Sequence, residues 1–97
     1  MTKKITREEE ARLPLFGGHS EAREWFKGQY GDDFMLTGSE TYGQVKCYFY
    51  DLILDREVYE REQRKLYEGR ISDGAIAFLN SYQSIQIHET GEVHIVH

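Results

Sequence analysis

The sequence is poor in the residues that build disulfide or zinc frameworks and in long apolar runs. It has one cysteine and one proline in 97 residues. A single cysteine cannot close an internal disulfide or supply a cysteine-rich zinc site. No apolar run reaches the roughly 18 residues that a membrane-spanning helix needs, and no charged-then-apolar leader opens the segment. We therefore expect a protein of the reducing cytosol that makes no membrane contact.

Basic residues are also scarce, and they are unevenly placed. The net charge is −5, and residues 72–97 contain no lysine or arginine at all. Residues 45–71 hold six basic groups, but six acidic groups are interleaved with them. Binding to phosphate needs clustered cations. The charge pattern therefore argues against nucleic acid and anionic membranes as partners.

Motifs for catalysis and for cofactors are absent as well. The glycine pairs fit no phosphate-binding or dinucleotide-binding loop, and no nucleophile elbow or zinc-protease helix is present. We expect no cofactor. An enzyme would need a catalytic site assembled from residues far apart in the sequence.

The composition is that of one folded domain. Hydrophobic residues make up 39% of the chain and aromatic residues 13%, which is too apolar for a disordered protein. The elements read in the order helix, helix, strand, strand, helix, helix, strand, strand. We predict a single α+β domain over residues 1–97, with 1–5 frayed. Its core would be a four-stranded antiparallel sheet of two hairpins, with three to four short helices packed mainly on one face.

Capping residues set the expected helix boundaries. Thr6 forms a capping box with Glu9, and Ser20 and Asp55 are suitable caps for two longer helices. These signals place helices at 7–12, 21–30 and 56–68, with a further short helix that Ser72 and Asp73 begin. The first of these lies just before Pro14, and Gly31 and Gly69 end the next two.

The strongest strand runs from Val45 to Leu54, and both of its faces are apolar or aromatic. Such a strand is typical of the centre of a sheet that is covered on both sides. Phe34–Thr37 is expected to pair with it. Either 38–40 or 42–44 could form the turn between them, and the sequence leaves that choice open.

The C-terminal hairpin allows its register to be predicted. A three-residue loop at 89–91, with Gly91 in the left-handed conformation that such loops favour, places Ile87 opposite Val93. The next pair on the same face is then Ile85 and Ile95. The other face carries polar side chains, which is typical of a half-exposed hairpin.

Tyrosine is the most informative component of the composition, with seven copies. A tyrosine combines apolar area with a polar hydroxyl, which suits protein interfaces. We predict a protein partner or self-association, through an aromatic-rich sheet face or an edge strand. The candidate partner-binding residues are Tyr42, Tyr48, Tyr50, Tyr59 and Tyr67.

Two histidines of the C-terminal hairpin suggest an alternative function. His88 and His94 are expected on the same polar face, and Glu92 could join them as a third ligand of a divalent metal ion. The alternative is therefore a small-ligand or metal-binding domain. The plainer interpretation is that these histidines are exposed on a sheet face.

Asp51 interrupts the apolar pattern of the central strand. A buried carboxylate is costly unless it is paired. We expect Asp51 to mark a strand end or a bulge, or to accept a hydrogen bond from a tyrosine hydroxyl or a loop amide. A second alternative function is an enzyme with a dispersed site near this residue. Cys47, on the same face, is expected to act as a small buried hydrophobe.

Overall fold

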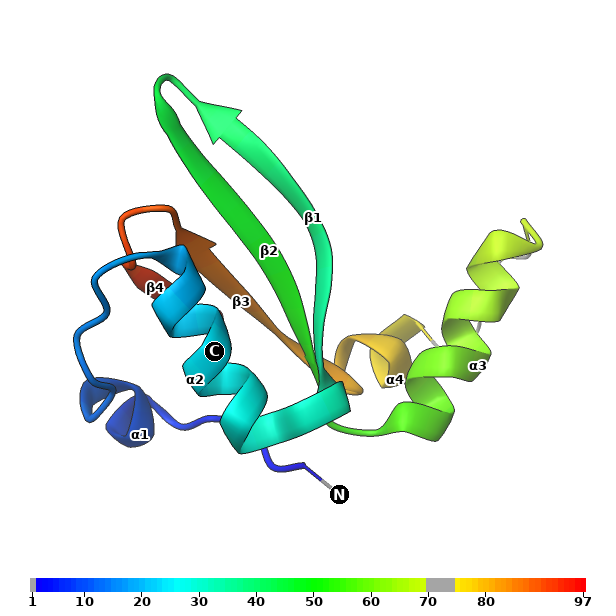
Figure 1. Cartoon of the computed structure of the whole chain (residues 1–97). Helices are drawn as coiled ribbons and strands as arrows, with labels where there is room; N and C mark the ends of the chain where they lie inside the picture. Colours follow the sequence, from blue (N-terminus) through cyan, green and yellow to red (C-terminus); the bar gives the residue numbers. More distant parts are fainter. Residues whose placement is uncertain (1, 70–74) are drawn as a thin grey trace.

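The centre of the sheet is the strand with the strongest apolar pattern, β2 (Val45–Ile53). The computed structural model describes residues 2–69 and 75–97. β2 pairs antiparallel with β1 (Phe34–Tyr42) on one side and with β3 (Tyr82–His88) on the other. β4 (Val93–Ile95) completes the order β1-β2-β3-β4 (Figure 1). The predicted α+β fold, with a four-stranded antiparallel sheet built from two hairpins, is confirmed.

The helices follow the capping signals closely, with one exception. They are α1 (Arg7–Ala11), α2 (His19–Tyr30), which continues into the 3-10 turn η1 (Gly31–Asp33), α3 (Arg56–Tyr67) and α4 (Ala75–Leu79). Thr6 and Asp55 cap α1 and α3 as predicted. The prediction that Ser20 caps α2 is wrong, because the N-cap is Gly18 and no side chain bonds there. Ser72 and Asp73 lie outside the described residues. No helix in the described ranges is long and apolar enough to cross a membrane.

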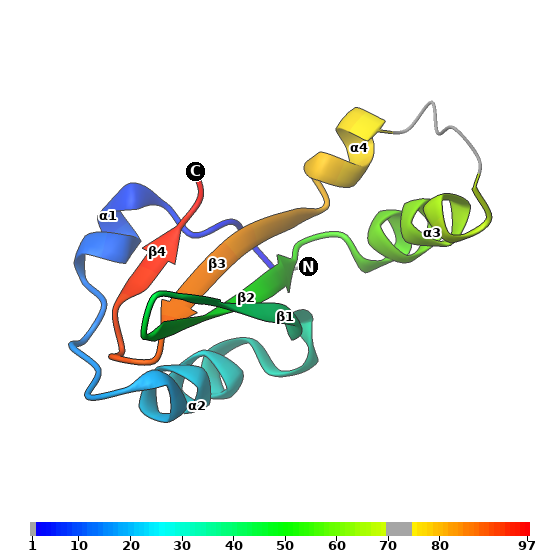
Figure 2. The ribbon, with the colours of Figure 1, turned by 90° about the horizontal axis from the view of Figure 1, so that it is seen from above.

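The hydrophobic core lies between α2 and one face of the sheet (Figure 2). Phe34 is at its centre, with ring centroids 5.1 Å from Phe26 of α2 and 4.3 Å from Tyr50 of β2. The predicted fraying of residues 1–5 does not extend to Ile5. Its backbone N–H and C=O both bond to the Gln83 side chain, and its own side chain is buried.

α3 and α4 pack against the opposite face of the sheet, at the end where β2 finishes and β3 begins. Tyr59 of α3 packs against Phe78 of α4 and Tyr82 of β3, with centroids 5.6 and 5.7 Å away. Tyr82 and Asp51 point away from the α2 side, because their neighbours along the strands point into the core. Helices therefore cover one face along α2 and the other face only at one end.

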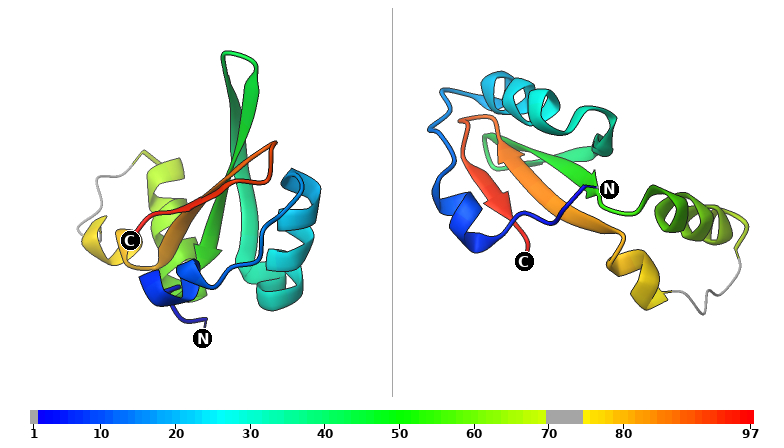
Figure 3. Two further views of the ribbon diagram at one scale, coloured as in Figure 1. Left: turned by 90° about the vertical axis from the view of Figure 1, so that its left-hand side faces the viewer. Right: turned by 90° about the horizontal axis from the view of Figure 1, so that it is seen from below.

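The β1–β2 hairpin is longer than expected and rises above the rest of the molecule (Figures 1 and 3). β1 continues to Tyr42, so 38–40 lies within the strand, next to an irregularity of register between Leu36 and Gly38. The turn is formed by Gly43 and Gln44. Gly43 has φ 63°, and Gln44 is not among the described residues with a positive φ, all of which are glycines. Positive φ at the first central position alone fits a type II′ turn.

The C-terminal hairpin has the predicted register. Ile87 is opposite Val93 and Ile85 is opposite Ile95, and Gly91 has φ 97°. Its loop also contacts the start of α2, since His19 N–H donates to the Glu89 carbonyl at 3.2 Å. The N-terminal half of the chain is thereby attached to the end of the sheet.

Candidate partner-binding site

The outer edge of β1 is long and uncovered. β1 has nine residues, and every one after Phe34 is exposed. It pairs only with β2 within the part of the chain that the structure describes. Its sequence contains no lysine, arginine or proline, the residues that usually keep an edge from pairing with other chains. The register irregularity beside Gly38 and the single charge of Glu40 are the protective features that this edge does have.

The opposite edge of the sheet, formed by β4, is covered by other parts of the chain. β4 has three residues, and the N-terminal segment lies beside it. Glu10 of α1 accepts a hydrogen bond from Ile95 N at 3.4 Å and contacts His97 Nε2 at 2.6 Å. The Gln83 side chain bonds to the carbonyls of both Ile5 and Val96. Among the described residues, β1 therefore presents the one extended, unoccupied edge.

A cluster of histidine and tyrosine joins the start of α2 to β2, beside this edge. The His19 ring stacks on Tyr48 at 3.5 Å, and its Nε2 lies 2.6 Å from the Tyr50 hydroxyl. Lys46 Nζ lies 4.9 Å from the centroid of the Tyr48 ring. Burial lowers the pKa of His19, and the charges of Arg23 and Lys46 lower it further, so the ring is held in its neutral form.

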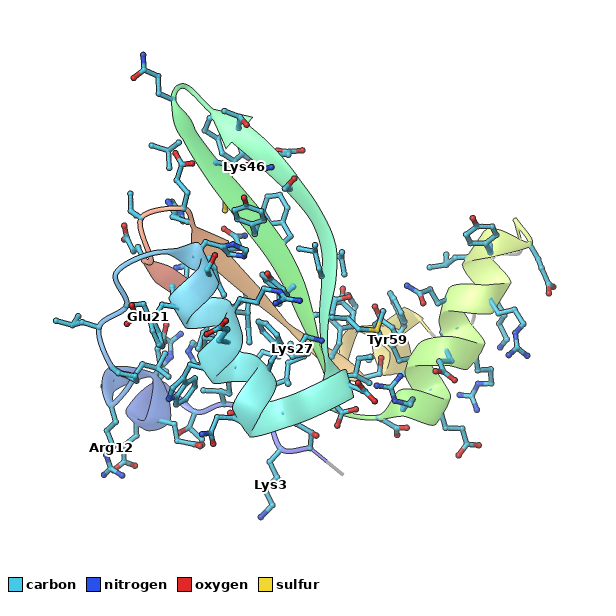
Figure 4. The ribbon with its side chains drawn as sticks, in the orientation of Figure 1. Lys3, Arg12, Glu21, Lys27, Lys46 and Tyr59 are labelled. Carbon is cyan, nitrogen blue, oxygen red and sulfur yellow. The ribbon has the colours of Figure 1, made fainter. Side chains whose placement is uncertain are left out.

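The basic residues around this cluster have no acidic partners. Within the described ranges, no carboxylate lies within 4.0 Å of Arg23, Lys27 or Lys46. His19, Arg23 and Lys27 are spaced i, i+4, i+8 and so share one flank of α2. Figure 4 shows Lys27 directed toward the foot of the β1–β2 hairpin and Glu21 on the other side of the helix. Arg23 and Lys27 make this flank a basic stripe beside β1, and the neutral ring of His19 lies at its start.

The five tyrosines predicted to bind a partner do not form one surface. Tyr50 and Tyr59 are each 1% exposed and belong to the two aromatic clusters inside the molecule. Tyr48 is half-buried under His19. Tyr42, 60% exposed, lies at the tip of the hairpin, and Tyr67, 94% exposed, lies at the end of α3. Tyr42 is the one fully exposed tyrosine on β1.

The proposed metal ligands are not brought together. No group of three His, Cys, Asp or Glu side chains in residues 2–69 and 75–97 is placed to hold a metal ion. His88 ends β3, His94 is exposed on β4 and Glu92 precedes β4. Cys47 is buried as expected, and burial raises its pKa, which keeps it a thiol.

Asp51 takes the hydrogen bond that its position predicts. Its Oδ2 accepts from the Tyr59 hydroxyl at 2.7 Å. Burial raises the pKa of Asp51, although the bond from Tyr59 works against that rise. The pair joins β2 to α3 in the aromatic contact with Tyr82, so the residue holds the helix on the sheet.

An edge strand was one of the predicted binding surfaces, but the sequence did not place it on β1, and the basic stripe was not predicted. The stripe could have been found, because Arg23 and Lys27 have helical spacing. The length of the β1 edge could not, because 38–40 resembles a turn in composition. No family model, curated protein or solved structure matches the chain.

Proposed function

We propose that the chain is a cytosolic protein-binding module whose partner adds a strand to the outer edge of β1. The observation that carries the proposal is the nine-residue edge whose side chains are exposed from Met35 to Tyr42. Such an edge offers a row of N–H and C=O groups to an extended polypeptide, and this is a common mode of peptide recognition.

Apolar side chains along the hairpin support this mode of binding. Leu36 is 54% exposed, and Met35, Tyr42 and Val45 are exposed as well. An added strand would cover part of this surface, which contributes roughly 25 cal/mol for each Å² removed from water. The backbone bonds would give affinity, and pockets beside these side chains would give selectivity.

The test is to find the partner and then to map where it binds. A photo-crosslinking amino acid at Thr41 on β1 is compared with one at Glu60 on α3, in extract from the native host. The captured protein is then purified, and hydrogen exchange is measured in the reconstituted complex. We expect the outward-facing amides of β1 to become protected on binding, while amides of α3 exchange as before.

Two results would overturn the proposal. The first is a complex in which protection falls on α3 and α4, where Tyr67, Ile76 and Leu79 are exposed, and β1 is unchanged. The second is a purified partner that forms no complex with the chain.

A further inference from the structure

The charges beside the β1 edge indicate what kind of segment it would take. From the basic stripe on α2, and resting on the proposed function above, we infer that the occupant is an extended acidic segment of a partner protein. Its carboxylates would alternate along one face of the added strand and meet Arg23 and Lys27.

The spacing of the stripe fits an extended chain. Side chains four apart on a helix are separated by about 6 Å along its axis. Side chains two apart on a strand lie on one face and are separated by roughly 6.7 Å. Arg23 and Lys27 can therefore meet two acidic residues at alternate positions of one strand. Among the described residues, neither side chain would give up an ion pair to do so, and Arg23 lies close enough to the Tyr50 hydroxyl to oppose the rise that burial causes in its pKa.

The face of β1 that lies on the α2 side carries no negative charge that would repel an anion. Leu36, Ser39 and Thr41 are the exposed residues of β1 on the α2 side, because they pair with Tyr50, Tyr48 and Lys46. None of the three is charged. The one acidic residue of β1, Glu40, pairs with Cys47 and so points to the other face.

A second copy of this chain fits the edge poorly. If β1 paired antiparallel with β1 of another molecule, the face toward α2 would again present Leu36, Ser39 and Thr41, with no carboxylate for Arg23 or Lys27. A parallel pair would bring only one carboxylate, that of Glu40, to this face, whereas the stripe has two cations. The basic stripe therefore favours a different protein as the occupant.

Three short peptides test the inference directly. Each has seven residues of high strand propensity, with two glutamates, two glutamines or two lysines at alternate positions. Binding is followed through the backbone amide signals of β1 in NMR spectra, at low and at high salt. We expect the acidic peptide to shift the β1 signals and to bind about tenfold more tightly than the glutamine peptide, with the difference shrinking in salt.

A pair of variants shows whether the stripe is responsible. Arg23→Gln with Lys27→Gln should remove the preference for the acidic peptide while β1 still binds. Both sites are on the surface of α2, and glutamine is a good helix former. The matched control is Lys3→Gln with Lys4→Gln, which removes the same charge from the N-terminal segment and should leave the preference intact.

Results that would overturn the inference can be distinguished from results that would overturn the proposed function. Equal binding of the acidic and glutamine peptides at β1 overturns the inference and leaves the edge proposal standing. Tighter binding of the lysine peptide also overturns it. No shift of β1 with any peptide counts against the edge itself. Shifts of β1 that grow with protein concentration alone identify a second copy as the occupant and overturn the inference.

Discussion

Two polar pairs show how single residues attach the outer elements to the sheet. The Tyr59 hydroxyl donates to Asp51 between α3 and β2, and Glu10 of α1 binds both Ile95 N and His97 beyond β4. Asp51 sits where the strand pattern calls for an apolar residue, and the cost of burying its carboxylate is offset only while its partner is present. Glu10 is partly exposed and acts by joining α1 to the end of β4.

Removing the Tyr59 hydroxyl should therefore destabilise the fold. Tyr59→Phe keeps the ring against Phe78 and Tyr82 but leaves the Asp51 carboxylate without this donor. We expect the free energy of unfolding in urea to fall by about 1–2 kcal/mol.

Tyr82→Phe is the matched control in the same cluster. The Tyr82 hydroxyl takes part in no hydrogen bond within the described residues, so its loss should change the free energy of unfolding by less than about 0.5 kcal/mol. Equal effects of the two variants would show that the Asp51 bond contributes nothing measurable.

The Glu10 contacts should make stability depend on pH. The hydrogen bond with His97 lowers the pKa of Glu10 from its usual 4.5, and the bond from Ile95 lowers it too, although burial opposes them. A carboxyl with a lowered pKa stabilises the fold above its unfolded pKa, and this contribution is lost as pH falls through the folded pKa. Glu10→Gln should thus cost roughly 1 kcal/mol at pH 7, and the cost should shrink steadily as the pH falls below 4.5.

The control for this prediction lies on the same helix. Glu8 pairs with Arg12 at 2.9 Å, but both side chains are exposed, and such pairs contribute little. Urea unfolding of Glu8→Gln at the same pH values should resemble wild type throughout. A Glu10→Gln deficit that is as large at acidic pH as at pH 7 would contradict the electrostatic explanation.

At the scale of elements, the sequence correctly predicts the features that local patterns determine. Its predictions are wrong where the extent of an element depends on pairing with a distant strand. The register of β3 and β4 follows from alternation together with Gly91, because only one register buries all the isoleucines. β1 was predicted too short, because Gly38, Ser39 and Glu40 have turn propensities that pairing with β2 overrides. The position of α2 over Tyr48 and Tyr50 depends on packing, which no local pattern encodes.

Two glycines provide a paired test of these elements. Gly91 has φ 97°, and a Cβ there would lie 2.8 Å from Gly18 N and closer still to the Phe16 carbonyl oxygen. Gly91→Ala should lower the free energy of unfolding by roughly 2–4 kcal/mol from strain and clash. In α2, by contrast, nothing lies within 4 Å of a Cβ on Gly28, so Gly28→Ala should raise it by about 0.5–1 kcal/mol. A similar effect of both substitutions would contradict the crowded contact between the two loops.

At the scale of the whole molecule, stability and the candidate interface are separated in space. The main hydrophobic core lies between α2 and the sheet, whereas the tip of the hairpin extends beyond it (Figures 1 and 3). The residues of β1 near the tip pair with β2 but have no helix over them. A surface that recruits an added strand can thus adjust to its partner without loss of the core.

Hydrogen exchange on the free protein should reveal this separation. β3 pairs on both sides and buries Ile85 and Ile87, so its amides should open only with global unfolding. Amides between Ser39 and Tyr42 have β2 as their one neighbour and should exchange through local opening. We expect these amides to exchange at least about 100-fold faster than those of β3, which corresponds to an opening free energy lower by roughly 2.7 kcal/mol. Equal protection of the β1 and β3 amides from exchange would contradict this expectation, because the hairpin tip would then unfold together with the core. In that case the β1 edge would have to bind a partner as a rigid template.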